Sequence, residues 1–354
     1  YEVPAPICGE NGVLVRTKTS LVSAGTEKMI VDLAKKSLLG KAKARPDLVK
    51  QVVNKMKQEG VKNTLEKVFT KLDTPIPLGY SCVGEVVEVG SQIKAFRVGD
   101  RVASCFFSNW LDGPATQDNI ASAIGTSLAG VAQEYYTCKE AALIKLPKDI
   151  DLELAACLPC AALTAWVALE EAAVDASKQV LIQGTGGVAL FALQFAKYLG
   201  AECLAITSSD EKAILLHQLG ASEIIRYDEE PKWGKAVLAA TKEGVDVVVD
   251  TAGNYQESLR CLKIGGHIAA IGNTAGLSSE IKPIFFFMKQ VHLRGHMVGS
   301  KAAFQRMLEF MVTHKIESCI SHRFFIRDIA KAFDCMEEKE HTGKILMVFN
   351  EDDV

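Results

Sequence analysis

The chain has 354 residues, 48% hydrophobic and 23% charged, and this size and composition predict two soluble domains. The formal net charge of -3 gives no electrostatic basis for binding nucleic acid or an anionic membrane surface. The N-terminal residues lack the pattern of a signal peptide, and no uncharged apolar run approaches the ~20 residues needed to span a bilayer. Because the ten cysteines are scattered through apolar runs, we expect reduced thiols and a cytoplasmic protein.

Residues 1–25 alternate like short strands after the turn Asn11-Gly12, and a basic segment follows them. Residues 28–72 carry a net charge of +8, which leaves -11 for the rest of the chain. Apolar residues recur at helical spacing from Leu48 to Met56 and from Leu65 to Leu72, so we expect a pair of amphipathic helices. A solvated outer face is the simplest interpretation of their lysines, and a lid that attracts an anionic substrate is the alternative.

A second set of strands follows the stretch Pro77-Leu-Gly-Tyr80, which places a tyrosine at a proline-glycine corner. Residues 85–89, 99–102 and 134–138 alternate with period two between glycine corners, which is typical of an antiparallel barrel. Phe106, Phe107 and Trp110 form either an apolar substrate wall or part of the core. A helix is expected near residues 163–172.

From Lys178 the chain alternates apolar strands with helices, which indicates a doubly wound parallel sheet. The strand Gln179–Gln183 leads into Gly184-Thr-Gly-Gly-Val-Ala189, with Gly186, Gly187 and Val188 opening the next helix. Gly184 permits the tight turn, Gly186 lets the backbone approach phosphates, and the helix N-terminus offers free N–H groups. This motif therefore predicts a dinucleotide site.

The end of the second strand of this sheet indicates which dinucleotide binds. A carboxylate there would bond the adenosine ribose of NAD, whereas this chain has Ser208, with Lys212 one helical turn further on. Hydroxyl and ammonium groups can donate hydrogen bonds to a 2′-phosphate, so we predict that the protein prefers NADPH to NADH. Asp210 and Glu211 are expected to be acids of a helix N-terminus.

Two further patterns concern cysteine and histidine. Cys157-Leu-Pro-Cys160 lacks a redox or metal context, so two buried thiols are expected. His292 and His296 lie in a strand pattern and are expected to be surface or interface residues on one face.

Several of these motifs together resemble the medium-chain dehydrogenase/reductase superfamily. They are Leu158–Trp166, Gln183–Ala189, Gly265–Ile268 and Val298–Lys301. The resemblance implies an α/β fold with a GroES-like antiparallel β-barrel catalytic domain over residues 1–160, with a basic helical insert at 28–72. A Rossmann sheet would cover 161–300, and residues 301–354 would return to the first domain. The first ~95 residues resemble another branch of such enzymes.

The resemblance also implies roles for single residues. Tyr227 matches a tyrosine that contacts the adenosine phosphate, and Gly299, Ser300 and Lys301 match a segment near the nicotinamide or phosphate. A homodimer through the last strand of the cofactor sheet is likewise implied.

Zinc-dependent members take their metal ligands from three positions, and only one ligand remains here. Ala24 stands where the first cysteine would be, Tyr80 stands where the histidine would be, and Cys160 keeps the third position. One thiolate and a neutral phenol do not make a catalytic zinc site, so we expect no metal.

The main hypothesis is a zinc-independent, NADPH-dependent reductase of quinones or enones that acts on a small molecule. Tyr80 and Thr26 would orient and protonate an activated C=C or C=O, although both residues are also explained as pocket lining. An alcohol or polyol dehydrogenase and a non-catalytic NADPH-binding protein are the alternatives.

Overall fold

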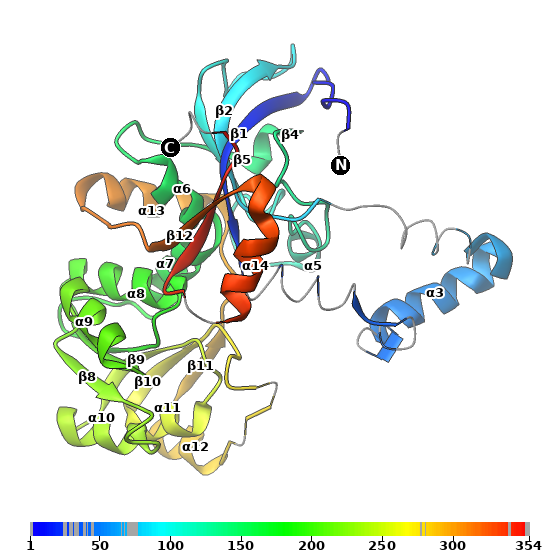
Figure 1. Ribbon diagram of the computed structural model, residues 1–354. Coiled ribbons are helices and arrows are strands. Elements are labelled where there is room, and N and C mark those ends of the chain that lie inside the picture. The colour runs from blue at the N-terminus through cyan, green and yellow to red at the C-terminus, as the bar shows by residue number, and fades with distance from the viewer. Residues whose placement is uncertain are drawn as a thin grey trace.

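The computed structural model describes residues 3–23, 27, 31, 35–37, 40, 42–43, 46–64, 66, 68, 77–276, 278–279, 281–338 and 341–350. Their strands form one mixed sheet and one parallel sheet, which lie side by side (Figure 1). Thr26 and Ala24 fall outside the described residues, as does most of the second predicted basic helix.

The mixed sheet has the order β12-β13-β1-β2-β3-β5, with β4 paired to β1. Its strands are β1 (Gly12–Val22), β2 (Cys82–Val89), β3 (Arg101–Ser104), β4 (Tyr135–Lys139), β5 (Leu143–Lys145), β12 (Ile320–Phe325) and β13 (Lys344–Val348). The predicted C-terminal strand pairs with the first one, because Leu21 lies opposite Leu346 in an antiparallel register. The barrel-like domain therefore includes both ends of the described chain.

The parallel sheet has the order β11-β10-β9-β6-β7-β8, which is that of a dinucleotide-binding fold. Its strands are β6 (Gln179–Gln183), β7 (Glu202–Thr207), β8 (Glu223–Arg226), β9 (Val245–Asp250), β10 (Leu262–Ala270) and β11 (His292–Gly295). Val180 and Ile182 pack toward one helical layer and Leu181 toward the other, so both faces of β6 are buried. This double burial explains the continuous apolar runs of the sequence.

Helices cover the two sheets and connect them, and the last helix packs on β12 and β13 of the mixed sheet. They are α7 (Leu163–Glu171), α8 (Gly187–Tyr198), α9 (Asp210–Leu219), α10 (Trp233–Thr241), α11 (Tyr255–Cys261), α12 (Ile284–Lys289), α13 (Lys301–Thr313) and α14 (Ile329–Glu337). Short elements are α5 (Gln117–Ile120), η1 (Glu140–Ala142), η3 (Ile326–Asp328), α6 (Leu152–Cys157) and a π turn, η2 (Leu158–Ala162).

The expected domain boundary at residue 160 falls inside a continuous helical stretch. Residues Leu152–Glu171 run through α6, η2 and α7 without a break. By length and composition this stretch would suffice to cross a membrane, but 78% of it is buried, as in a core helix of a soluble protein. It therefore joins the two domains rigidly.

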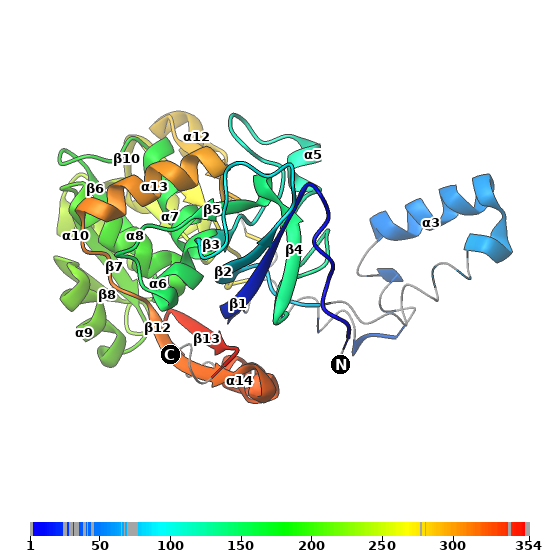
Figure 2. The same ribbon diagram turned by 90° about the horizontal axis from the view of Figure 1, so that it is seen from above.

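Within the described part of the basic insert lies the helix α3 (Pro46–Glu59), which agrees with the first of the two predicted helices. In both views α3 lies apart from the two sheets (Figures 1 and 2). Val49 and Val53 are exposed on it, as are Lys50, Lys55 and Lys57. Its lysines are thus solvated, whereas the lid alternative stays open.

Candidate active site

The corner that carries Tyr80 is fixed by backbone hydrogen bonds to residues 130–132. Gly130, Val131 and Ala132 donate their N–H groups to the carbonyls of Pro77, Gly79 and Leu78 at 2.8–2.9 Å. Gly79 has a φ of +88°, and a Cβ there would lie 2.8 Å from that of Ala132, so this position requires glycine. The corner is consequently rigid and directs Tyr80 inward.

Tyr80 is fully buried between the barrel and the π turn. Burial first, and then the nearby Cys160 thiol and Glu27 carboxyl, raise the pKa of Tyr80 well above its ordinary value. Its ring lies 5.4 Å from that of Phe106, which is buried together with Phe107. Phe106 and Phe107 therefore belong to the core, and Phe106 also packs on Tyr80. Trp110 is half-buried.

Cys160 lies in the π turn, where Thr164 donates a hydrogen bond to its carbonyl at 2.6 Å. Burial raises the pKa of both Cys157 and Cys160, the former to about 12, so both thiols are protonated at neutral pH. No disulfide joins the ten cysteines, all of which the structure describes. Cys157 is thus a buried thiol as predicted, whereas Cys160 is half-buried.

The glycine loop after β6 has the geometry that a dinucleotide needs. Gly184 has a φ of +78°, and Gly186 caps α8 with no side-chain hydrogen bond. A Cβ on Gly186 would meet no atom within 4 Å, so its open side is where phosphates would approach. The free N–H groups of α8 therefore fit a pyrophosphate.

A buried hydrogen-bond network fixes the ends of the two strands next to the glycine loop. Gln183 donates to the Ser258 hydroxyl and Ser258 donates to Asp250, both at 2.8 Å. Asp250 also accepts the N–H groups of Ala252 and Gly253. These bonds fix the carboxyl ends of β6 and β9, where ligands of such sheets bind.

The predicted 2′-phosphate residues lie at the end of β7. Ser208 follows the strand, Ser209 caps α9, and Lys212 lies in the first turn of that helix, with Asp210 and Glu211 as its N-terminal acids. Arg226, at the end of β8, was not predicted and forms ion pairs with Asp210 and Asp228. Its neighbour Tyr227 is 41% exposed at the same rim.

The segment 299–301 has structural roles in addition to its predicted one. Ser300 caps α13, and a Cβ on Gly299 would collide with the side chain of Val167. The Lys301 ammonium donates to the Glu140 carbonyl of the barrel domain at 3.0 Å. These contacts tie the two domains together, and the predicted contact with the cofactor stays a prediction.

Two candidates, Glu27 and Lys344, lie outside the predicted set. Lys344 opens β13, and its ammonium lies 3.3 Å from the Tyr80 hydroxyl. Glu27 is 2% exposed, and burial raises its pKa to about 7. An acidic residue next to Thr26 was the available signal for Glu27, whereas nothing local marks Lys344.

The donor set at this corner does not fit a catalytic zinc ion. The described residues contain no group of three or more His, Cys, Asp or Glu able to hold a metal. Beside Tyr80 the nearest such groups are the thiol of Cys160 and the carboxyl of Glu27, and Ala24 supplies no donor atom.

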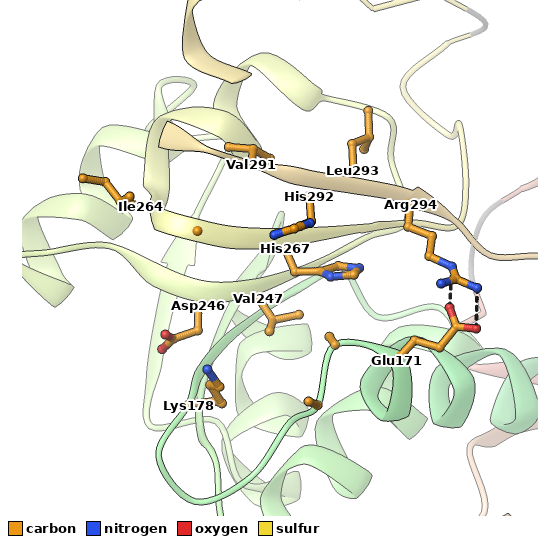
Figure 3. Close-up of a pocket in the computed structure, with 13 residues that line it drawn as sticks. Glu171, Lys178, Asp246, Val247, Ile264, His267, Val291, His292, Leu293 and Arg294 are labelled. Carbon is orange, nitrogen blue, oxygen red and sulfur yellow. Dashed lines mark hydrogen bonds and ion pairs between the residues drawn. The ribbon is translucent and has the colours of Figure 1, made fainter. Parts of the chain in front are cut away.

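A separate cavity of about 760 Å³ opens at the opposite ends of the strands (Figure 3). Lys178, Asp246, His267 and His292 line it, next to the Arg294–Glu171 ion pair. Because ligands bind such sheets at the carboxyl ends of the strands, we do not place the substrate there.

The prediction that His292 and His296 share a surface face was wrong. His292 is exposed on β11, but His296 lies beyond the strand and is buried, with Nδ1 3.3 Å from Glu171. Burial lowers the pKa of His296 to about 4, so it packs as a neutral ring.

The barrel, the six-stranded sheet and the open glycine loop define a two-domain, dinucleotide-dependent oxidoreductase. Two family models match the chain, a zinc-binding dehydrogenase at residues 187–313 and an alcohol dehydrogenase GroES-like domain at 49–148. The chain belongs to the medium-chain dehydrogenase/reductase superfamily.

Known relatives cover most of the chain. A zinc-type alcohol dehydrogenase-like protein of Schizosaccharomyces pombe is 33% identical over 84% of this chain and 90% of its own length. Acryloyl-coenzyme A reductase of Metallosphaera sedula is 29% identical over 80% and 86%. The 2-methylene-furan-3-one reductase of Solanum lycopersicum is 30% identical over 85% and 71%.

A solved structure from Sinorhizobium meliloti 1021, assigned as an alcohol dehydrogenase, superposes with a TM-score of 0.82. The two proteins are 29% identical, and the match covers 98% of this chain and 93% of the other. The fold class is therefore confirmed.

Proposed function

We propose that the protein is a zinc-independent, NADPH-dependent reductase that transfers hydride to an activated C=C or C=O. The observation that carries this proposal is the buried phenol of Tyr80, which Lys344 connects to the dinucleotide loop and which by resemblance occupies the position of a metal ligand in zinc-dependent members. Two of the relatives described above reduce conjugated carbonyl compounds by name, which favours this substrate class over alcohols.

NADPH supplies the hydride when bound, and the protein must supply a proton to the other end of the double bond. Tyr80 is protonated at neutral pH even at the ordinary pKa of a phenol, and burial raises this pKa further, so the hydroxyl holds a proton for the enolate carbon or the carbonyl oxygen. Phe106 packs on the phenol ring and limits its movement. Thr26 stays a prediction as a second hydroxyl at this site.

The choice of NADPH rests on the residues at the end of β7. The residue after β7 is Ser208 and not a carboxylate. Lys212 and Arg226 add positive charge at the ends of β7 and β8. Since Asp210 holds Arg226, a 2′-phosphate would have to displace that carboxylate. Fluorescence titration should give a lower Kd for NADPH than for NADH, and equal constants would contradict this choice.

The reaction is tested with a panel of substrates, and turnover is measured as the oxidation of NADPH. We expect turnover with but-3-en-2-one, acryloyl-coenzyme A or a quinone, unchanged by 1,10-phenanthroline. Tyr80→Phe should lower kcat by about 100-fold, because a general acid contributes on the order of 10²–10⁴. Ile214→Phe, on the exposed face of α9, is the matched control and should keep full activity.

Other outcomes would favour one of the two alternative functions. Reduction of NADP⁺ by alcohols or polyols, lost on chelation, would indicate a zinc-dependent alcohol dehydrogenase. Tight NADPH binding with no turnover on any of these compounds would indicate a non-catalytic protein.

A further inference from the structure

Lys344 connects the dinucleotide loop to Tyr80. Gly343 donates its N–H to the Thr185 carbonyl at 2.9 Å, which brings the start of β13 onto the loop. The stem of Lys344 then covers Gly187, where a Cβ would lie 2.8–3.2 Å from its carbons. From there the ammonium reaches the Tyr80 hydroxyl at 3.3 Å.

Glu27 is the acidic group of the same cluster. Both of its carboxylate oxygens are buried, and within the described residues neither has a partner with hydrogen-bond geometry. Burial raises its pKa to about 7, while nearby backbone amides and the Lys344 ammonium act in the opposite direction. A carboxyl group with this environment exchanges a proton near neutral pH.

The remaining titratable groups near Tyr80 are the thiols of Cys157 and Cys160. On its other side Lys344 lies near the His341 imidazole, whose pKa is lowered by burial and then by Lys344. Neither thiol carries charge at neutral pH, since burial raises the pKa of both. Lys344 therefore supplies the positive charge nearest to the phenol among the described residues.

A buried phenol that gives up its proton leaves an anion in a dry site. Such an anion is costly unless a cation lies next to it. In zinc-dependent relatives a metal supplies positive charge at this corner, and the donor set here does not fit one. The ammonium of Lys344 is placed to take over that charge.

We propose that Lys344 is a positioning residue that orients the Tyr80 hydroxyl and balances its phenolate, and that Glu27 returns the proton. This inference rests on the function proposed above. As the substrate accepts hydride, the Tyr80 O–H bond breaks and a C–H or O–H bond forms on the substrate. The Lys344 ammonium then gives a proton to the phenolate and takes one from the Glu27 carboxyl, and a proton from solvent restores Glu27 once the product has left.

The experiment compares Lys344→Met, Lys344→Arg and Glu27→Gln in the full-length enzyme with but-3-en-2-one and saturating NADPH. Lys344→Met should lower kcat by about 100-fold with little change in the KM of the enone, and Lys344→Arg should restore most of the rate. The wild-type kcat should fall as pH rises through about 7, where Glu27 loses its proton. Glu27→Gln should lower kcat about 10-fold and remove this limb of the pH profile.

The control is Lys331→Met. It removes a lysine of α14 that is paired with Asp328, and it should leave kcat unchanged. If Lys344→Met raises only the Kd of NADPH, with normal kcat at saturation, then Lys344 serves the cofactor alone and the inference is wrong. A Glu27→Gln profile identical to wild type would also overturn it.

A readout without turnover separates this inference from the proposed function. In protein with ¹³Cζ-labelled tyrosine, the Tyr80 resonance is assigned by its loss in Tyr80→Phe. It should move in Lys344→Met and stay in place in Lys331→Met. An unmoved resonance rejects the pairing, whereas an inactive wild type with a moved resonance rejects only the reductase function.

Discussion

A single buried residue at the Tyr80 corner carries a cost in stability. Glu27 has no hydrogen-bond partner among the described residues and is buried beside Tyr80 and Lys344. Because its pKa is raised from 4.5 to about 7, the folded state holds a proton that the unfolded state releases between these values. Stability from this group is complete below about pH 4.5 and is lost as pH rises through about 7.

Glu27→Gln should therefore stabilise the protein at pH 8, by up to about 3 kcal/mol for a shift of this size. It should also remove the part of the decline in unfolding free energy that lies between about pH 4.5 and 7. Urea unfolding at several pH values measures this, with Glu243→Gln on the exposed surface as the control. If the unfolding free energies of wild type and Glu27→Gln change with pH in parallel, the raised pKa of Glu27 is refuted.

The residue scale also shows what local sequence can identify. Tyr80 and the glycine loop were predicted because a proline-glycine corner and a strand-loop-helix motif are local patterns. Lys344 was missed because it is separated from Tyr80 by 264 residues and from Gly187 by more than 150. The pairing of β13 with β1 and β12, together with the bond from Gly343 to Thr185, brings it to the site.

Among the secondary-structure elements, the junction that leads into β13 after α14 decides how the C-terminal segment meets the cofactor loop. Gly343 has a φ of +65°, and a Cβ there would lie 2.0 Å from the Cys319 carbonyl oxygen. Its N–H also bonds Thr185 in the dinucleotide loop. The junction thus requires glycine for both its dihedral angle and its space.

Gly343→Ala should lower the unfolding free energy by more than about 2 kcal/mol and weaken dinucleotide binding. Gly265→Ala is the matched control, since Gly265 has a φ of +76° but nothing within 4 Å of a built Cβ. It should cost only the strain of its dihedral angle, about 1 kcal/mol. Equal losses in the two variants, measured by urea unfolding, would show that the contact with Cys319 has no effect.

On the scale of the whole molecule, the edge of the parallel sheet is exposed. All four residues of β11 are exposed, with Leu293 at 38%, and Phe287 and Met288 of the preceding helix α12 are each 65% exposed. An uncovered edge strand with apolar neighbours favours pairing with a second copy. We therefore propose the homodimer through β11.

Sedimentation velocity should show a dimer for the wild type. Leu293→Lys should shift it toward monomer, because paired copies would bring added charges together in an apolar contact. Ile214→Lys, a similar change on exposed α9, should leave the dimer intact. A wild type that sediments as a monomer would contradict the proposed homodimer.

The sequence by itself determined the alternation of a barrel-like half with a doubly wound half and the dinucleotide loop, because hydrophobic period and glycine spacing are short-range patterns. The replacement of two zinc ligands was predicted from the resemblance to zinc-dependent members. The tertiary structure decided that residues 152–171 form one helical stretch across the expected boundary, and that His296 is buried. It also placed Glu27, Tyr80 and Lys344 in one cluster, because strand pairing and burial join residues whose separation along the chain carries no local signal.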